Sequence, residues 1–367
     1  MGRKVYLCAV IVNVMAKVEQ LLALIERYRQ LGIDAQIDYD KFYLYSIITH
    51  STALEGSTIS ELENQILFDD GISVNGKSII EQMMNLDLKR AYEESLQLAK
   101  QHADITVELL KKLSHLVMQN TGSTYKTALG EFSSAAGDLR LLNVTAGVGG
   151  KSYLNYQKIP AELDKFCKWL NVQRRLNLSI AELYLLSFEV HYRLVTIHPW
   201  ADGNGRMARL LMNYIQFEYG LEYGLIPTKV LKEDKGDYIN ALVATRESGN
   251  ISHFLGFMIE QMIKSLSWEI EIFLKSMAET GEIEDPAATW GTLLKKGDQP
   301  FNRSKKRGKS REKILVILKE YPHYSARRVA EVIGITPKAV EKHLTKLKAE
   351  GLIIRYGPDK GGKWMVL

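Results

Sequence analysis

The pattern of apolar and polar residues predicts helices in three separate parts of the chain. Residues 41–54 mix aromatic and aliphatic side chains and favour a helix, which Gly56 would end because glycine readily takes left-handed conformations. A second helix is expected to begin at Asn204, where apolar side chains recur at spacings of three, one and three. These side chains are Met207, Leu210, Leu211 and Tyr214. The third part runs from Ser310 to the C-terminus.

The C-terminal part has the order helix, helix, turn and helix. The first helix would end at Tyr321, before a proline, and the second would begin after Ser325. Thr336 as N-cap and Pro337 as the first helical residue would start a third helix that runs to about Glu350. The apolar faces of the three helices are formed by Ile314, Leu315, Ile317 and Leu318, by Val329, Val332 and Ile333, and by Val340, Leu344 and Leu347.

Two expected strands, residues 352–356 and 363–366, complete this part around a glycine-rich turn. The order resembles a winged helix-turn-helix over residues 310–367, which implies that the third helix enters the major groove of DNA. Its outward residues are Lys338, Lys342, His343, Lys346 and Lys348. Winged helices also dock on proteins, so both DNA and a protein remain possible partners of this part.

Charge is distributed unevenly along the chain. Residues 301–367 carry 17 Lys and Arg against 6 Asp and Glu, a net charge of +11, whereas the chain as a whole carries +5. The basic part begins with the polar run of residues 302–309, which predicts a linker. A basic C-terminal part is compatible with nucleic-acid binding.

The segment from His198 to Arg209 combines an imidazole, a carboxylate, an amide, two glycines and two guanidinium groups. Pro199 disfavours a helix at its start. Gly203 and Gly205 permit a sharp turn and the close approach of a ligand to the backbone. A helix that begins at this turn would leave its first N–H groups free, and free N–H groups at a helix start form an anion site.

The other side chains of this segment favour phosphate chemistry. Arg206 and Arg209 are three residues apart and are expected on a face opposite the apolar stripe, and guanidinium groups match phosphate oxygens. Asp202 could hold Mg²⁺, whose other ligands would be phosphate oxygens and water. His198 could accept a proton near neutral pH. For any one of these residues alone, the alternative is a structural loop with a helix cap and surface arginines.

The whole segment resembles the signature of the Fic family, His-x-Phe-x-acid-Gly-Asn-Gly-Arg-x-x-Arg, with Trp200 at the phenylalanine position. Residues 191–197, 210–213 and 71–77 also look Fic-like, and the resemblance covers roughly residues 40–265. It implies a mainly α fold, a Fic helical core with a small β-hairpin flap. It also implies that the aromatic side chain at position 200 anchors the loop in the core.

The resemblance implies a protein adenylyltransferase, which moves AMP from ATP to a Ser, Thr or Tyr hydroxyl of a target protein or of the chain itself. His198 would take the hydroxyl proton, and Asp202 would position Mg²⁺ on the α- and β-phosphates. The nucleotide-binding residues would be Gly203, Asn204, Gly205, Arg206 and Arg209. Alternatives are removal of AMP, transfer of another phosphate-linked group, and a DNA-binding regulator whose Fic part senses nucleotide; a sensor would not need a general base.

The segment from Ser51 to Gly56 resembles the Fic inhibitory motif, Ser or Thr followed by three residues and Glu-Gly or Glu-Asn. Ser51 and Glu55 are four residues apart and share one face of a helix. The resemblance implies that Glu55 pairs with Arg209, occupies the place of the γ-phosphate and inhibits the enzyme. If AMP removal were the activity, Glu55 would orient water. The alternative is an ordinary helix end with a solvated glutamate.

Two further segments match the family more weakly. Residues 130–160 are glycine-rich, and they predict two short strands around a glycine turn. The β-branched residues of this segment are Val144, Thr145 and Val148. The resemblance implies a flap that begins at Arg140 and docks the target backbone by strand addition. The alternative is an irregular surface loop. Tyr238 would lie near the adenine base, and a plain core position is its alternative.

Length and composition indicate an ordinary globular protein of more than one domain, with 46% hydrophobic and 25% charged residues among 367. We expect four parts. These are an N-terminal helical region with the inhibitory helix (1–108), a Fic catalytic domain (109–265), a helical or linker segment (266–309) and the winged helix-turn-helix (310–367).

The location of the protein is predicted from its cysteines and its apolar runs. Cys8 and Cys167 lack metal-ligand spacing and favour a reducing compartment. No apolar run reaches the ~20 residues that span a bilayer, so no membrane partner is expected. We expect a cytoplasmic protein, and a homodimer is compatible with the sequence. Arg3 and Lys4 followed by the apolar residues 5–15 could pass for a short signal peptide, but ATP, the implied substrate, is cytoplasmic. Translation could begin at Met1 or Met15.

Overall fold

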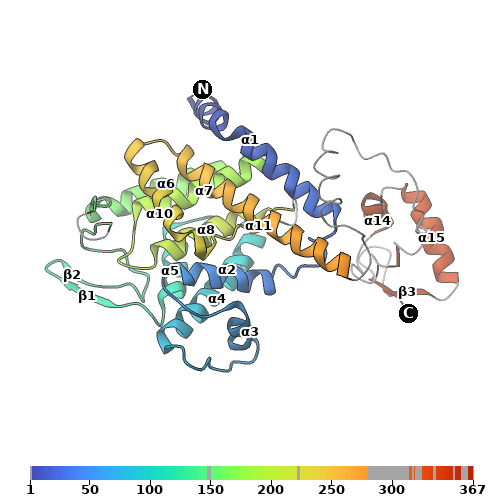
Figure 1. Ribbon diagram of the computed structural model, residues 1–367, viewed down its shortest axis with the longest axis horizontal. Coiled ribbons are helices and arrows are strands. Elements are labelled where there is room, and N and C mark those ends of the chain that lie inside the picture. The colour runs from blue at the N-terminus through green and yellow to red at the C-terminus, as the bar shows by residue number, and fades with distance from the viewer. Residues whose placement is uncertain are drawn as a thin grey trace. The chain divides into compact units, whose positions relative to one another are not determined.

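The chain divides into two compact units, Met1–Gly297 and Asp298–Leu367, and each is treated by itself. The computed structural model describes residues 2–146, 150–220, 224–279, 314–315, 318, 325–333, 336–349, 352–356 and 363–366. Within these residues the fold is mainly helical, as predicted (Figure 1).

The first unit consists of helices and one β-hairpin. Its helices are α1 (Gly2–Gln30), α2 (Phe42–Ala53), α3 (Glu61–Asp69), α4 (Ile79–Lys100), α5 (Val107–Met118), η1 (Tyr156–Lys158), α6 (Ile159–Arg174), α7 (Ile180–Ile197), α8 (Asn204–Glu218), η2 (Lys232–Asp234), α10 (Lys235–Ser248) and α11 (Ser252–Glu279). The predicted helix over residues 41–54 is confirmed as α2, and the helix expected at Asn204 is confirmed as α8.

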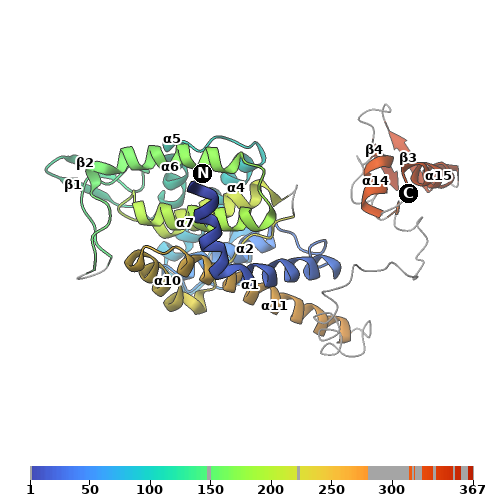
Figure 2. The same cartoon turned by 90° about the horizontal axis from the view of Figure 1, so that it is seen from above.

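Helices α7 and α8 lie side by side at the centre of this unit (Figure 1). Helices α4 and α5 pack on α8, and α6 and α11 pack on α7. Seen from above, α6 lies on one side of α7, and α10 and α11 lie on the other (Figure 2). Helix α1 packs along α11. The segment between α7 and α8 therefore carries the predicted chemistry at the centre of the bundle.

The start of three helices is fixed by the same local device. In each case a serine side chain accepts a hydrogen bond from the third helical N–H, and a glutamate accepts one from the serine N–H, so two donors at the helix start are satisfied. The pairs are Ser60 with Glu63 on α3, Ser78 with Glu81 on α4, and Ser179 with Glu182 on α7. No helix among the described residues is long and apolar enough to cross a membrane.

The β-hairpin lies upstream of the predicted position. Strands β1 (Thr124–Thr127) and β2 (Gly130–Ser133) pair antiparallel and project from the helices (Figure 1). Tyr125 and Phe132 face each other across the pair, and their stacked rings stabilise it. Around the expected turn, Thr145 and Ser152 form only an isolated antiparallel bridge. Residues 147–149, including Val148, lie outside the described part.

The second unit contains α14 (Ala326–Ile333), α15 (Pro337–Ala349), β3 (Ile353–Tyr356) and β4 (Lys363–Val366). The two strands are antiparallel, with Ile353 opposite Val366. The predicted cap of α15 is confirmed, because Ala339 N–H donates to the Thr336 hydroxyl (3.3 Å). Its core contains Ile314, Leu318, Val329, Val340, Leu344, Leu347, Ile353 and Trp364.

Some predictions for the second unit cannot be compared with the fold. Ile317, the first helix end at Tyr321 and the turn over residues 357–362 lie outside the described residues, as do the side chains of Val332 and Ile333. On α15, Lys338, Lys342, Lys346 and Lys348 are exposed and His343 is half-buried. The basic face expected for the third helix is therefore present on α15.

Candidate functional site

His198 is the first residue after α7 and turns the chain sharply. Its backbone is left-handed (φ 53°, ψ 62°), an uncommon conformation for a residue with a side chain. Its N–H still bonds to Leu194 O (3.0 Å), and Nδ1 lies 3.1 Å from Val195 O. Because a carbonyl can only accept, Nδ1 carries the hydrogen, and Nε2 is left with a free lone pair. His198 is thus oriented as a proton acceptor.

The surroundings of His198 keep the imidazole neutral. Burial lowers its pKa to about 4, and the positive charges of Arg140 and Arg246 act in the same direction. The hydrogen bond to Val195 O and the charge of Asp202 act in the opposite direction. At neutral pH the imidazole is therefore unprotonated and available as a base.

Arg140 joins the backbone after α7 to the segment of residues 142–154. Its Nε donates to His198 O (2.8 Å), and its backbone N–H donates to Pro199 O (3.0 Å). The other two guanidinium nitrogens donate to Leu142 O and Leu154 O. One buried side chain thus holds both ends of the 142–154 segment beside His198.

Trp200 anchors the loop as predicted, and its side chain is 0% exposed. Its Nε1 donates to Gly137 O (3.2 Å). Its backbone N–H and C=O are both bonded to the side-chain amide of Asn204, at 3.1 and 2.9 Å. The Asn204 side chain therefore closes the turn, and only the backbone N–H of this residue is left to meet a ligand.

The start of α8 has the properties of an anion site. Gly203 is the N-cap with φ of 80°, and no side chain among the described residues caps the helix, so its first N–H groups are free there. Gly203 has a backbone conformation that favours glycine, and both glycines are closely approached by other side chains. A Cβ on Gly203 would lie 2.7 Å from the sulfur of Met118, and one on Gly205 would lie 2.8 Å from an oxygen of Glu55. The carboxylate of Glu55 thus lies directly over this helix start.

Arg206 and Arg209 were expected on a face opposite the apolar stripe of α8, and both are buried at 3% exposure. The reason is that α8 is the central helix, so that every face of it is covered by a neighbour. Arg206 donates to Met118 Sδ (3.0 Å), and its Nε has no hydrogen-bond partner among the described residues. Oδ1 of Asp202 lies 3.8 Å from Nη2 of Arg206. A buried guanidinium with a free N–H suits an anionic ligand.

Arg209 is paired with Glu55, which comes from the end of α2. Its Nη2 donates to Glu55 Oε1 (2.6 Å) and to Ser51 O (3.0 Å), and its Nε donates to Ser51 Oγ (2.8 Å). Burial disfavours the ionised carboxylate, but the charge and hydrogen bond of Arg209, together with the charges of Arg206 and Lys235, outweigh burial and lower the pKa of Glu55. Burial likewise opposes the charge of Arg209, whose pKa is nevertheless raised by Glu55. The structure therefore brings Ser51, Glu55 and Arg209 together, and Gly56 follows in a left-handed conformation (φ 108°).

Tyr238 is buried and lies next to Arg209. Its hydroxyl is 3.5 Å from Arg209 Nη1 and 3.0 Å from Nε2 of His191 on α7. Burial, and then the charge of Arg209, lowers the pKa of His191 far below its usual range, so His191 is neutral. His191 was not predicted as a site residue; its one distinguishing feature in the sequence is that it precedes His198 by two helical turns. Contact of Tyr238 with adenine stays a prediction.

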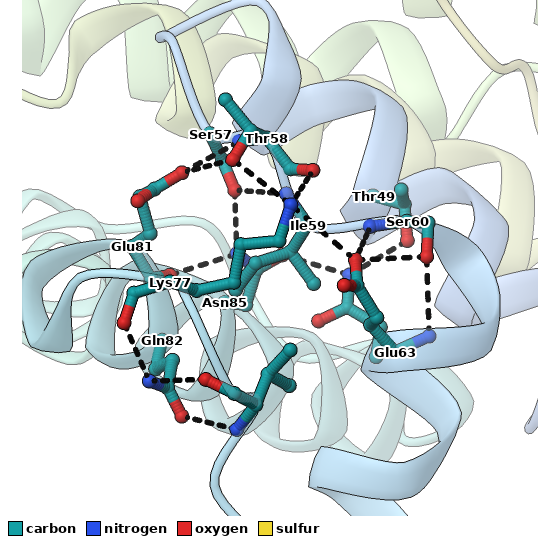
Figure 3. Close-up of polar contacts among 12 residues, drawn as sticks. Thr49, Ser57, Thr58, Ile59, Ser60, Glu63, Lys77, Glu81, Gln82 and Asn85 are labelled. Carbon is teal, nitrogen blue, oxygen red and sulfur yellow. Dashed lines mark hydrogen bonds and ion pairs between the residues drawn. The ribbon is translucent and has the colours of Figure 1, made fainter.

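The backbone that follows Glu55 is fixed by a polar cluster on the start of α4 (Figure 3). Glu81 Oε1 accepts hydrogen bonds from both the N–H and the hydroxyl of Thr58, at 2.7 and 2.8 Å. These bonds, with those from Ser78, lower the pKa of Glu81 to about 2. Lys77 Nζ donates to Thr58 O (2.7 Å). None of these contacts was predicted from the sequence.

Asn85, one turn further along α4, contacts residues on both sides of Glu55. Its Nδ2 donates to Ser57 Oγ (3.1 Å), and its Oδ1 accepts from Thr52 Oγ1 (2.7 Å). Asn64 of α3 donates to the same oxygen (2.9 Å). We call Lys77, Glu81 and Asn85 the α4 clamp. The clamp determines where the end of α2 lies, and hence where Glu55 lies.

Asp202 is the carboxylate expected to hold Mg²⁺, and its side chain is 58% exposed. One of its oxygens accepts from Gly203 N–H (2.6 Å). Within the described part of the chain, no group of three or more His, Cys, Asp or Glu could hold a metal ion. A single carboxylate suits Mg²⁺, which can take its remaining ligands from phosphate and water. The site therefore fits a metal that arrives with a nucleotide.

Two family models match the chain. The Fic/DOC family matches residues 104–216, which contain α5 to α8 and the His198 loop. A winged helix-turn-helix DNA-binding family matches residues 308–354.

Individual proteins are similar over longer stretches of the chain. The chain is 27% identical to protein adenylyltransferase fic-1 of Caenorhabditis elegans over 196 residues, 53% of this chain and 35% of that protein. It is 28% identical to protein adenylyltransferase Fic of Drosophila melanogaster over 247 residues, 64% of this chain and 46% of that protein. The chain thus spans less than half the length of these relatives.

Among solved structures, a Fic-domain-containing signalling protein from Bacteroides thetaiotaomicron has the same fold. The two agree with a TM-score of 0.56 at 23% identity, over 70% of this chain and 97% of that one.

Proposed function

Because the chain is a Fic/DOC family protein with a C-terminal winged helix-turn-helix domain, we propose that its helical unit is a protein adenylyltransferase. It would move AMP from ATP to a Ser, Thr or Tyr hydroxyl of a target protein. The observation that carries the proposal is the juxtaposition of a neutral, correctly oriented His198 with the uncapped N-terminus of α8. A base and an anion site side by side are what phosphoryl transfer requires.

The reaction follows from the positions of these groups. Nε2 of His198 takes the proton of the acceptor hydroxyl as its oxygen forms a bond to the α-phosphorus. The bond from that phosphorus to the bridging oxygen breaks, and pyrophosphate leaves. The free N–H groups at the start of α8 and the guanidinium of Arg206 stabilise the charge on the phosphate oxygens.

The proposal includes Mg²⁺ bound with the nucleotide. Asp202 would hold it, since its exposed carboxylate stands beside the start of α8. The metal would supply positive charge to the phosphates.

We further propose that Glu55 inhibits this activity. Its carboxylate lies over Gly205 and binds Arg209, so it stands where an outer phosphate would meet the same helix start and the same guanidinium. Two anions cannot share this position, and ATP would bind productively only after Glu55 leaves. A role of Glu55 in orienting water for AMP removal is the second candidate, because a third of its side chain is exposed.

One experiment separates the candidate reactions. The full chain and its Glu55→Gly variant are incubated with ATP labelled on the α- or the γ-phosphate, and label on protein is measured. Transfer of α-label alone supports AMP transfer, and γ-label would mean phosphorylation. Adenylylated protein that loses AMP with the unmodified chain, and not with Glu55→Gly, would favour removal. A chain that binds nucleotide without any transfer would favour a sensor.

For residues 310–367 we propose DNA binding, supported by the family match and by the three exposed lysines Lys338, Lys342 and Lys346 on one face of α15. Replacement of all three by glutamine should weaken binding to any duplex and reduce the salt dependence, because each phosphate contact releases counterions. Fluorescence anisotropy at several salt concentrations measures both effects. Absence of duplex binding at low salt would favour docking on a protein.

A further inference from the structure

The imidazole of His198 is covered on one face by the ring of Tyr153. The ring centroids are 3.8 Å apart and the planes differ by 17°, a stacked arrangement. Tyr153 belongs to the 142–154 segment, whose ends Arg140 ties to the backbone at His198. Arg140 therefore holds both the backbone of His198 and the segment that carries Tyr153.

The outer face of Tyr153 is covered in turn by Arg246 of α10. The guanidinium carbon lies 5.5 Å from the ring centroid, within the range of a cation–π contact. The phenol ring is thus held between an imidazole and a guanidinium. A ring enclosed on both faces has little freedom to tilt, so it can fix the plane of the imidazole against it.

We propose that Tyr153 is a positioning residue for His198, which holds the plane of the imidazole and keeps water from one of its faces. The hydrogen bond from Nδ1 to Val195 O fixes one direction of the ring, and the stack fixes its rotation about that direction. Together they determine where the lone pair of Nε2 points. Since that lone pair lies in the plane of the imidazole, a ring stacked on its face leaves it open to the acceptor hydroxyl.

The covered face also has an electrostatic consequence. Water can no longer solvate the imidazolium from that side, which supports the low pKa of His198. The other groups that act on this imidazole are Val195 O, Arg140, Asp202 and Arg246, and all of them remain when the phenol ring is removed. Loss of the ring should therefore raise the pKa toward the ordinary histidine value of about 6.5.

The test is a titration of His198 by NMR in the full chain labelled at histidine Cε1, with His198→Ala to assign its resonance. In Tyr153→Ala the pKa should rise by at least about one unit, whereas Tyr153→Phe, which keeps the ring, should leave it unchanged. Tyr125→Ala removes an aromatic stack of the β1–β2 hairpin and serves as the matched control. An unchanged pKa in Tyr153→Ala, or an equal rise in Tyr153→Phe, would overturn the inference.

A second readout, the rate of AMP transfer, rests on the proposed function. In a Glu55→Gly background, Tyr153→Ala should lower the rate of AMP transfer about tenfold. It should also move the acid limb of the pH–rate profile to higher pH, because the base must be unprotonated. If no variant transfers AMP, the proposed function fails, but the titration still decides the role of Tyr153. If the alanine variant does not fold, Tyr153→Ser, which also uncovers this face of the imidazole, provides the second titration, and an unchanged pKa there would overturn the inference.

Discussion

The two sides of the Glu55–Arg209 ion pair are held in different ways. Arg209 is 3% exposed and lies on the central helix, with contacts to Ser51, Glu55 and Tyr238. The side chain of Glu55 is 34% exposed, and it accepts a hydrogen bond from Arg209. If the pair opens, Glu55 is the side that can move, because Arg209 has no other place in the packed core.

The same contrast holds for the backbone around the two residues. The loop of residues 198–205 is held from within by the bonds between Trp200 and Asn204, and from outside by Arg140. The backbone after Glu55 is held from outside, by the α4 clamp (Figure 3). The proposed catalytic loop thus has hydrogen bonds of its own, whereas the position of Glu55 depends on contacts with α4, which can be altered independently of that loop.

The largest effect is expected for His198, the proposed catalytic base. His198→Ala should lower the rate of AMP transfer about a hundred- to ten-thousand-fold, because a general base contributes on that scale. Binding of a fluorescent ATP analogue should be retained, since the anion site at α8 is unchanged. His253→Ala, an exposed histidine on α11, is the control. Transfer at an undiminished rate in His198→Ala would remove the assigned role.

A smaller effect, of opposite sign, is expected on the inhibitory side. Glu55→Gly should raise AMP transfer by about ten- to a hundred-fold, since a charge-assisted hydrogen bond contributes roughly 1.5–3 kcal/mol. The partial exposure of Glu55 favours the lower figure. Glu55→Gln, which keeps an acceptor but not the charge, should give an intermediate rise. A flat response across several acceptor proteins, measured with α-labelled ATP, would contradict self-inhibition.

The smallest effect is expected for the α4 clamp. The carboxylate of Glu81 accepts at both oxygens, from Thr58 and from Ser78, and the amide of a glutamine can accept at only one. Glu81→Gln should therefore loosen the backbone after Glu55 and raise AMP transfer roughly two- to tenfold, the scale of one weakened hydrogen bond. Hydrogen exchange of residues 55–59 should become faster.

Two controls distinguish this effect from general destabilisation. Glu182→Gln changes the capping glutamate at the corresponding position of α7. It should leave both AMP transfer and hydrogen exchange at residues 55–59 unchanged. In a Glu55→Gly background, Glu81→Gln should add nothing, because the residue that the clamp positions is absent. An equal gain in both backgrounds would show that Glu81 acts by another route.

The sequence by itself determined the features that are local in the chain. The period of three and four predicted α8, the residue types before it predicted an uncapped start, and the caps and turns predicted the order of the C-terminal unit. The resemblance to the Fic family added the pairing of Glu55 with Arg209, residues that are 154 positions apart. Each of these predictions depends on residues within a few turns of one another or on a known motif.

Only the tertiary structure decided which distant groups complete the site. Tyr153 on His198, Asn85 between Thr52 and Ser57, and Tyr238 on His191 are contacts between elements, and no periodicity encodes them. Burial of both arginines likewise followed from the central place of α8, not from its own pattern. A helical or extended period specifies which face of an element is apolar, but which neighbour covers that face depends on how all the elements pack together.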